Sequence, residues 1–119
     1  MRDDLLNIEE LRKFGIEGPK EGKVIIDIYT QWCGPCKYVS PILEKLKDEG
    51  LIDLIQVDLD QNHPLGQAFG ITAIPTFLYF KDGLLLDKTI QIDGQKLIEN
   101  GMMIGAAGEL VFRKIIEKM

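Results

Sequence analysis

Hydrophobic residues repeat with two different periods along this chain, and the two periods predict alternating strands and helices. Residues 24–29, VIIDIY, are apolar on both faces apart from one aspartate, which is typical of a central strand covered on both sides. Apolar positions then recur at helical spacing from Cys36 to Leu46, so we expect an amphipathic helix that ends near Gly50 and contains Pro41. Further elements are predicted in the same way: strands at residues 51–59 and 76–80, and a short helix at residues 64–70.

Both ends of the chain carry helix patterns. Asn7 and Glu10 form a capping-box pattern ahead of a short helix that Gly15 closes. A terminal helix is predicted from Glu109 onward. Its apolar stripe consists of Phe112, Ile115, Ile116 and Met119. The order of elements predicts an α/β fold with a mixed central sheet and helices on both faces.

The segment between residues 84 and 105 has a less regular pattern. Asp82-Gly83 and Asp93-Gly94 are both hairpin signals, and strand-like residues follow each of them. We therefore expect residues 84–92 to form a strand and residues 95–105 to return antiparallel to it.

Composition and charge narrow the class of protein. A chain of 119 residues that is 45% hydrophobic and 28% charged, without repeats, is expected to form one domain over residues 1–119. Its net charge of -5, with no basic cluster, argues against nucleic acid as a partner. The sequence has no apolar run of signal-peptide or membrane-spanning type, so we expect a cytoplasmic protein with no membrane contact.

Both cysteines lie in the stretch TQWCGPCKYVSP, residues 30–41. In a reducing compartment such a pair is more often catalytic or metal-binding than structural. At a helix start, the helix dipole and unpaired backbone N–H groups favour the thiolate of the first cysteine, so Cys33 is the expected nucleophile. Cys36 shares the buried stripe of Val39 and Leu43, which suits a resolving thiol.

Asp27 is the one charged residue of the first predicted strand. Burial disfavours a charged carboxylate, so its pKa should be raised and it could accept the proton of the Cys36 thiol. Alternatively, Asp27 faces a solvent cavity, and the spacing leaves both interpretations open. Pro75, directly before another predicted strand, indicates by itself only a tight turn.

Taken together, these residues resemble the thioredoxin family. WCGPCK, residues 32–37, is that family's active-site motif letter for letter, and the family also has an aspartate six residues before the first cysteine. Pro41, the DLDQN stretch that begins at Asp58 and IPT at residues 74–76 match the family as well. The resemblance covers roughly residues 22–83 and resumes at residues 104–119.

The resemblance implies a thioredoxin fold with four to five strands in the sheet. It also implies an activity, the reduction of disulfides in client proteins, with electrons from a thioredoxin reductase and no bound cofactor. Cys33 would attack the client disulfide, and Cys36, deprotonated through Asp27, would release the reduced client. Proline between the cysteines is what the more reducing members carry. The chain is expected to act as a monomer.

By the same resemblance, clients would bind in a shallow apolar groove, and Pro75 would be in the cis form and would block metal capture by the two sulfurs. The groove would consist of Trp32, Gly34, Pro35, Ile74, Pro75, Gly105 and Ala106.

The chain departs from the family pattern in three places. Gln56 stands where many members have a lysine near the buried aspartate, and our hypothesis is that the pKa of Asp27 is therefore raised further than usual. Tyr29 stands in place of a second tryptophan. An insertion at roughly residues 84–103 lengthens the family's hairpin; we expect an extended arm that holds Met102 and Met103 near the groove, or alternatively a loop with core methionines.

Three other functions compete with disulfide reduction. A structural zinc site needs four ligands, and the chain offers two cysteines and one histidine, His63, in a predicted loop. The same fold could instead serve as an oxidant or isomerase, or as a binding subunit that does not use its redox pair. The intact WCGPCK motif with Asp27 and Pro75 favours the reductase.

Overall fold

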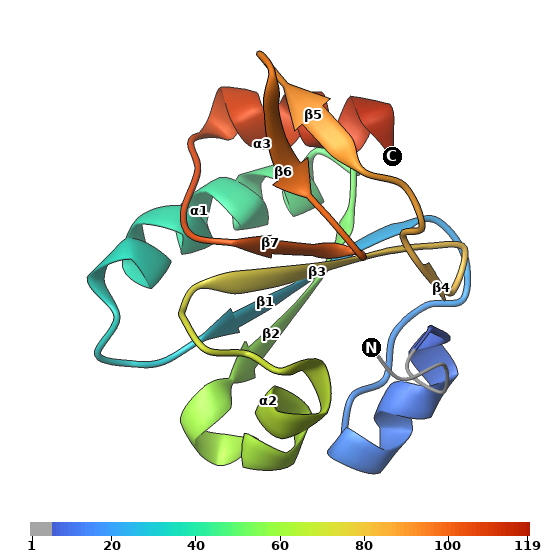
Figure 1. Ribbon diagram of the computed structural model, residues 1–119, viewed down its shortest axis with the longest axis vertical. Coiled ribbons are helices and arrows are strands. Elements are labelled where there is room, and N and C mark those ends of the chain that lie inside the picture. Colours follow the sequence, from blue (N-terminus) through green and yellow to red (C-terminus); the bar gives the residue numbers. More distant parts are fainter. Residues whose placement is uncertain (1–5) are drawn as a thin grey trace.

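The computed structural model describes residues 6–119, which form a central sheet with helices on both faces (Figure 1). The main sheet has five strands in the order β2-β1-β3-β4, and β7 also pairs with β3. Its strands are β1 (Lys23–Tyr29), β2 (Asp53–Asp58), β3 (Thr76–Lys81), β4 (Leu84–Leu85) and β7 (Met102–Ile104). The helices are α1 (Gly34–Asp48), α2 (His63–Phe69) and α3 (Glu109–Lys118), with two 3-10 helices, η2 (Ile8–Phe14) and η3 (Leu59–Gln61). The predicted mixed α/β sheet is confirmed.

A hydrophobic core lies on each face of the sheet, so the central strand β1 is covered on both sides. β1 runs parallel to β2 and antiparallel to β3. Alternate residues point to opposite faces: Ile25 packs with α1 and α3, whereas Ile26 packs with η2 and α2. The apolar run at residues 24–29 is thus the central strand that its pattern predicts.

The first helix is present, but as a 3-10 helix. Asn7 caps η2 by accepting a hydrogen bond from the Glu9 N–H at 3.0 Å, whereas the Glu10 N–H bonds to the Asn7 carbonyl. Gly15 ends the helix with a φ of 77°, a left-handed conformation that glycine adopts without steric cost. The capping residue was therefore predicted correctly, but the partner of its side chain was not.

The segment after β3 differs from the expected pair of long strands. β4 has only two residues, after which the chain leaves the sheet and forms a separate hairpin of β5 (Ile90–Ile92) and β6 (Gln95–Ile98). Asn100 and Gly101, with φ values of 53° and 74°, make a further turn that returns the chain to β3 as β7. The predicted continuous strand over residues 84–92 was wrong; the turns at Asp82-Gly83 and Asp93-Gly94 are confirmed.

The β5–β6 hairpin packs one side against the core. β5 contacts α3, and the hairpin lies against that helix (Figure 1). Ile90, Ile92 and Ile98 are buried in the same core as α3. The predicted hairpin insertion before the last strand is therefore confirmed, and its three buried isoleucines anchor it against the protein.

The two methionines of the insertion belong to the cores. β7 pairs with β3, so its side chains alternate between the faces of the sheet. Met103 is buried in the core with α3, and the Tyr79 hydroxyl donates to its sulfur at 3.9 Å. Met102 is half-buried against the opposite core. The alternative expectation of core methionines is the correct one.

No helix among residues 6–119 is both long enough and apolar enough to span a membrane.

Candidate active site

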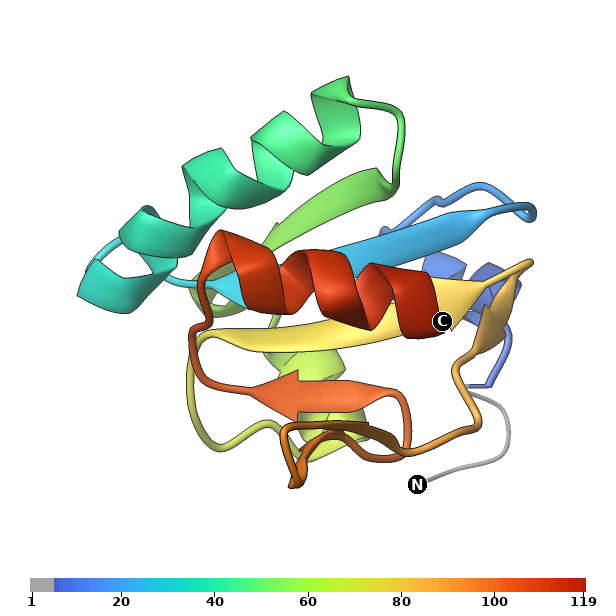
Figure 2. The ribbon, with the colours of Figure 1, turned by 90° about the horizontal axis from the view of Figure 1, so that it is seen from above.

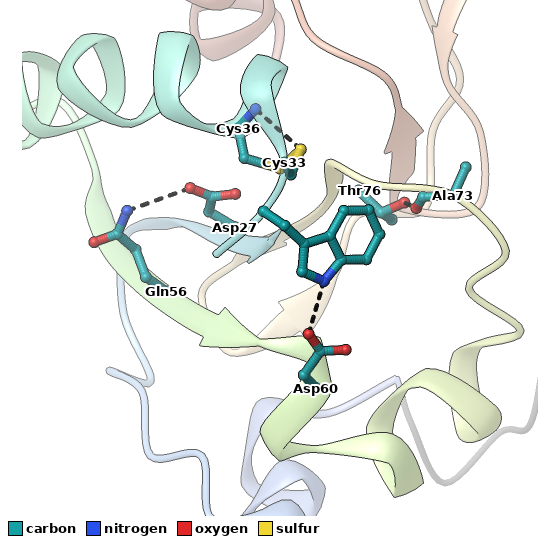
Figure 3. The surroundings of a disulfide bond; sticks show 8 residues. Asp27, Cys33, Cys36, Gln56, Asp60, Ala73 and Thr76 are labelled. Atoms are coloured by element: carbon teal, nitrogen blue, oxygen red, sulfur yellow. Dashed lines mark hydrogen bonds between the residues drawn. A yellow bond between two sulfur atoms is a disulfide. The ribbon is translucent and has the colours of Figure 1, made fainter. Parts of the chain in front are cut away.

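The two cysteines form a disulfide at the start of α1, with Cα atoms 5.3 Å apart (Figure 3). Cys33 is the N-cap of the helix, and its sulfur accepts a hydrogen bond from the Cys36 backbone N–H at 3.2 Å. Pro35 lies in the first turn, where its missing N–H costs nothing. When the disulfide is reduced, this N–H and the positive end of the helix favour a thiolate on Cys33.

Exposure does not distinguish the two sulfurs, since Cys33 is 5% exposed and Cys36 3%. Their neighbours do. Cys33 lies between the exposed residues Trp32 and Gly34, whereas Cys36 lies on the buried face of α1. The two cysteines therefore differ in their neighbours and not in their own exposed fraction: Cys33 has exposed neighbours, and Cys36 faces the core.

A pocket of about 420 Å³ lies beside Cys36. It contains both Asp27 and Cys36, and its walls come from β1, α1 and β2. Its lining consists of Asp27, Tyr29, Thr30, Gln31, Cys36, Lys37, Ser40 and Gln56. Asp27 is itself only 1% exposed. The two interpretations of Asp27 are thus compatible, because a buried carboxyl lines a pocket that it shares with Cys36.

Burial raises the pKa of Asp27 to about 6, and a hydrogen bond from Gln56 opposes the increase. The Gln56 side-chain nitrogen donates to Asp27 Oδ2 at 3.3 Å and to the Ser40 hydroxyl at 2.8 Å. Asp27 Oδ1 and the Thr30 hydroxyl are buried without a protein partner. The carboxyl can therefore hold or release a proton near neutral pH.

Sequence reasoning missed Ser40 and Thr30 as members of this pocket. Ser40 follows Cys36 by four residues on α1, so helical spacing places both on one face and was a usable signal. Thr30 directly follows β1, and its sequence neighbours gave no signal that its hydroxyl is buried.

The residues of the expected groove come from three parts of the chain: the start of α1, the turn before β3 and the segment after β7. Trp32 is 72% exposed, and its indole nitrogen donates to Asp60 Oδ2 at 3.0 Å (Figure 3). The Ile74-Pro75 bond is cis, and the Gly105 N–H donates to the Pro75 carbonyl at 2.8 Å.

Pro75 is thus held beside Gly105, while Pro35 is exposed and Ala106 is also at the surface. That this set binds clients stays a prediction. Asp60 belongs to the DLDQN stretch that matches the family, but the sequence assigned it no role at the site.

Within residues 6–119, no group of three or more histidine, cysteine or acidic side chains is arranged as metal ligands. His63 lies at the first position of α2. These residues therefore offer no ligand set for the zinc site considered above.

A family model described as Thioredoxin matches residues 10–102. The thioredoxin of Malassezia sympodialis is 40% identical over 77 residues, which cover 62% of this chain and 73% of that protein. The thioredoxin of Staphylococcus haemolyticus is 37% identical over 76 residues, with the same coverage of 62% and 73%.

Solved structures agree with this assignment. A point mutant of a thioredoxin from Halobacterium salinarum superposes with a TM-score of 0.68 at 25% identity, covering 92% of this chain and 82% of that chain. Mitochondrial thioredoxin 3 from Saccharomyces cerevisiae gives a TM-score of 0.64 at 28% identity, covering 97% of this chain and 92% of that chain. With the Cys33–Cys36 disulfide at the start of α1, these matches identify a thiol-disulfide oxidoreductase that belongs to the thioredoxin family.

Proposed function

We propose that this chain donates electrons to disulfides of client proteins, with Cys33 as the nucleophile and Cys36 as the resolving thiol. The observation that supports these roles best is the position of Cys33, which caps α1 and accepts the Cys36 N–H. The nucleophile needs a stabilised thiolate near the surface, whereas the resolving thiol needs only to reach Cys33.

The first step is attack of the Cys33 thiolate on a client disulfide. One Cys33–client S–S bond forms as the client S–S bond breaks, and the second client sulfur leaves as a thiolate that takes a proton from water. The exposed residues around Cys33, among them Trp32 and Pro35, provide the surface on which the client lies. Ile74, Pro75, Gly105 and Ala106 complete the proposed groove.

The second step releases the client. Cys36 gives its proton to the ionised Asp27 carboxyl through their shared pocket, and the Cys36 thiolate attacks Cys33. The Cys33–client bond breaks, the client leaves as a thiolate, and the Cys33–Cys36 disulfide forms. A raised pKa suits Asp27 to this role, because a base titrating near neutral pH accepts a proton and returns it.

A thioredoxin reductase would supply the two electrons and two protons that restore the dithiol. We further propose that residues 1–119 act as one domain and as a monomer in the cytoplasm, with the insertion at about residues 84–103 as a structural part of that domain.

The function is tested by reduction of insulin with dithiothreitol as the electron source. The wild-type chain should accelerate insulin precipitation, and Cys33→Ser should be inactive. Reduced Cys36→Ser, freed of dithiothreitol before insulin is added, should accumulate a mixed disulfide through Cys33. Equilibration with glutathione separates this function from its alternative: a reduction potential near that of isomerases would favour an oxidant or isomerase. Absence of turnover by the wild-type chain would favour a binding subunit.

A further inference from the structure

Within the part of the chain that the structure describes, the main sheet ends at β2, and the outer edge of this strand is open. Among residues 6–119, β2 pairs only with β1, over six consecutive residue pairs. Figure 2 shows it as the outermost strand on its side of the sheet. A strand paired on one side only directs alternate backbone N–H and C=O groups outward. The edge therefore presents unpaired donors and acceptors along about 17 Å of strand.

Neither a proline nor a bulge interrupts β2. A groove of about 340 Å³ lies beside it, between residues 55–58 and residues 15–17 of the loop after η2. Leu54 and Ile55 are half-buried and point to opposite faces, so each offers an apolar surface to a neighbouring strand.

The acidic residues at this edge determine which kind of strand can pair with β2. Asp53 and Asp58 stand at the two ends of β2, and Glu17 lines the same groove. If a second copy paired in register and antiparallel, Asp53 of one copy would face Asp58 of the other; in parallel pairing each aspartate would face itself. Like charges directly opposite destabilise a strand pair, so self-pairing is disfavoured.

We propose that the outer edge of β2 is a docking site for an extended segment of another protein, which joins the sheet as an additional strand. The segment has basic residues five positions apart, opposite Asp53 and Asp58, and apolar residues between them beside Leu54 and Ile55. Because Asp58 also accepts a hydrogen bond from Gln31 at 3.4 Å, the docked segment ends next to the loop that carries the cysteines. The docking does not depend on disulfide exchange and goes beyond the reductase activity.

The test uses the full chain labelled with ¹⁵N, in the oxidised form and at low salt, with the blocked hexapeptide KVTVVK as the probe. In the chain alone, every second amide of residues 53–58 should exchange rapidly with solvent, because only the others bond to β1. Saturating KVTVVK should slow the exchange of those amides. The acidic peptide EVTVVE should leave the exchange unchanged.

Two versions of KVTVVK, N-methylated at odd or at even positions, test whether the backbone is what binds. Only one set of peptide N–H groups can face β2, so one version should lose binding and the other should keep it. Equal binding by both versions, or slowed exchange elsewhere than at β2, would overturn the proposal.

A matched pair of charge variants completes the test. Asp53→Lys should weaken KVTVVK binding by about five- to tenfold and strengthen binding of EVTVVE, because one attractive pair becomes repulsive. Asp48→Lys changes the net charge equally from an exposed position on α1 and should leave both affinities within about twofold. Equal effects of the two variants would show a response to net charge alone and would refute docking at this edge. Insulin reduction is measured separately, so loss of the redox function and loss of docking are distinguishable.

Discussion

Replacing Asp27 by asparagine should stabilise the protein at alkaline pH. Burial holds the pKa of this carboxyl at about 6 in the folded chain, against an ordinary value of 3.8. The stability that protonated Asp27 contributes is fully present below pH 3.8 and is lost as the pH rises through about 6. One pKa unit corresponds to about 1.4 kcal/mol, so the difference between the folded and the ordinary pKa of Asp27 corresponds to about 3 kcal/mol of folding stability. Asparagine keeps the shape and removes the charge.

The measurement is urea unfolding at pH 4 and at pH 8. The oxidised protein is used because its disulfide leaves neither cysteine with a titratable proton. Asp27→Asn should raise the free energy of unfolding by about 2–3 kcal/mol at pH 8 and change it little at pH 4. Asp53→Asn removes an exposed carboxylate and should stay within about 0.5 kcal/mol at both pH values. An equal effect of Asp27→Asn at the two pH values, or destabilisation at pH 8, would refute the reasoning.

Three further predictions concern the pocket, the hairpin and the surface. Gln56→Lys places a cation beside Asp27 and should lower its pKa, which a ¹³C NMR titration of the carboxyl measures; an unchanged or higher value would contradict this. Ile98→Ala should reduce the free energy of unfolding by about 2–5 kcal/mol, since this side chain of the hairpin is fully buried; a loss below about 1 kcal/mol would show that the hairpin is not part of the core. Arg113→Ala breaks surface ion pairs with Glu49 and Glu109 and should cost about 1 kcal/mol or less, decreasing with added salt; a large, salt-independent loss would refute this.

The sequence was sufficient for those parts of the fold that depend on local pattern. A run of apolar residues on both faces identified β1, helical spacing identified α1 and α3, and Asp-Gly pairs located two hairpin turns. Each of these signals arises within a few neighbouring residues. The cysteine pair could be placed at a helix start for the same reason, because the amphipathic pattern begins there.

The rest depended on contacts between distant residues. Nothing near Leu86 indicates that the chain leaves the sheet, because its departure is set by packing against the core beneath α3. Asn100-Gly101 makes the turn into β7, whereas the local pattern predicts one returning strand over residues 95–105. The hydrogen bond from Trp32 to Asp60 joins the loop before α1 to η3, 28 residues further along the sequence. Strand pairing and burial that depend on distant residues cannot be predicted from the spacing of neighbouring residues.

The position next to β3 is filled by two pieces of chain. β4 pairs with Phe80 and Lys81, while β7 pairs with residues 76–78, so the two lie end to end along one strand. Between them, the Tyr79 N–H bonds to the Gly101 carbonyl and its carbonyl accepts from the Leu86 N–H. Tyr79 thus joins the two ends of the excursion. New termini or a fused reporter placed at the exposed Asp93-Gly94 tip would leave this joint intact, which makes the tip a suitable site for circular permutation.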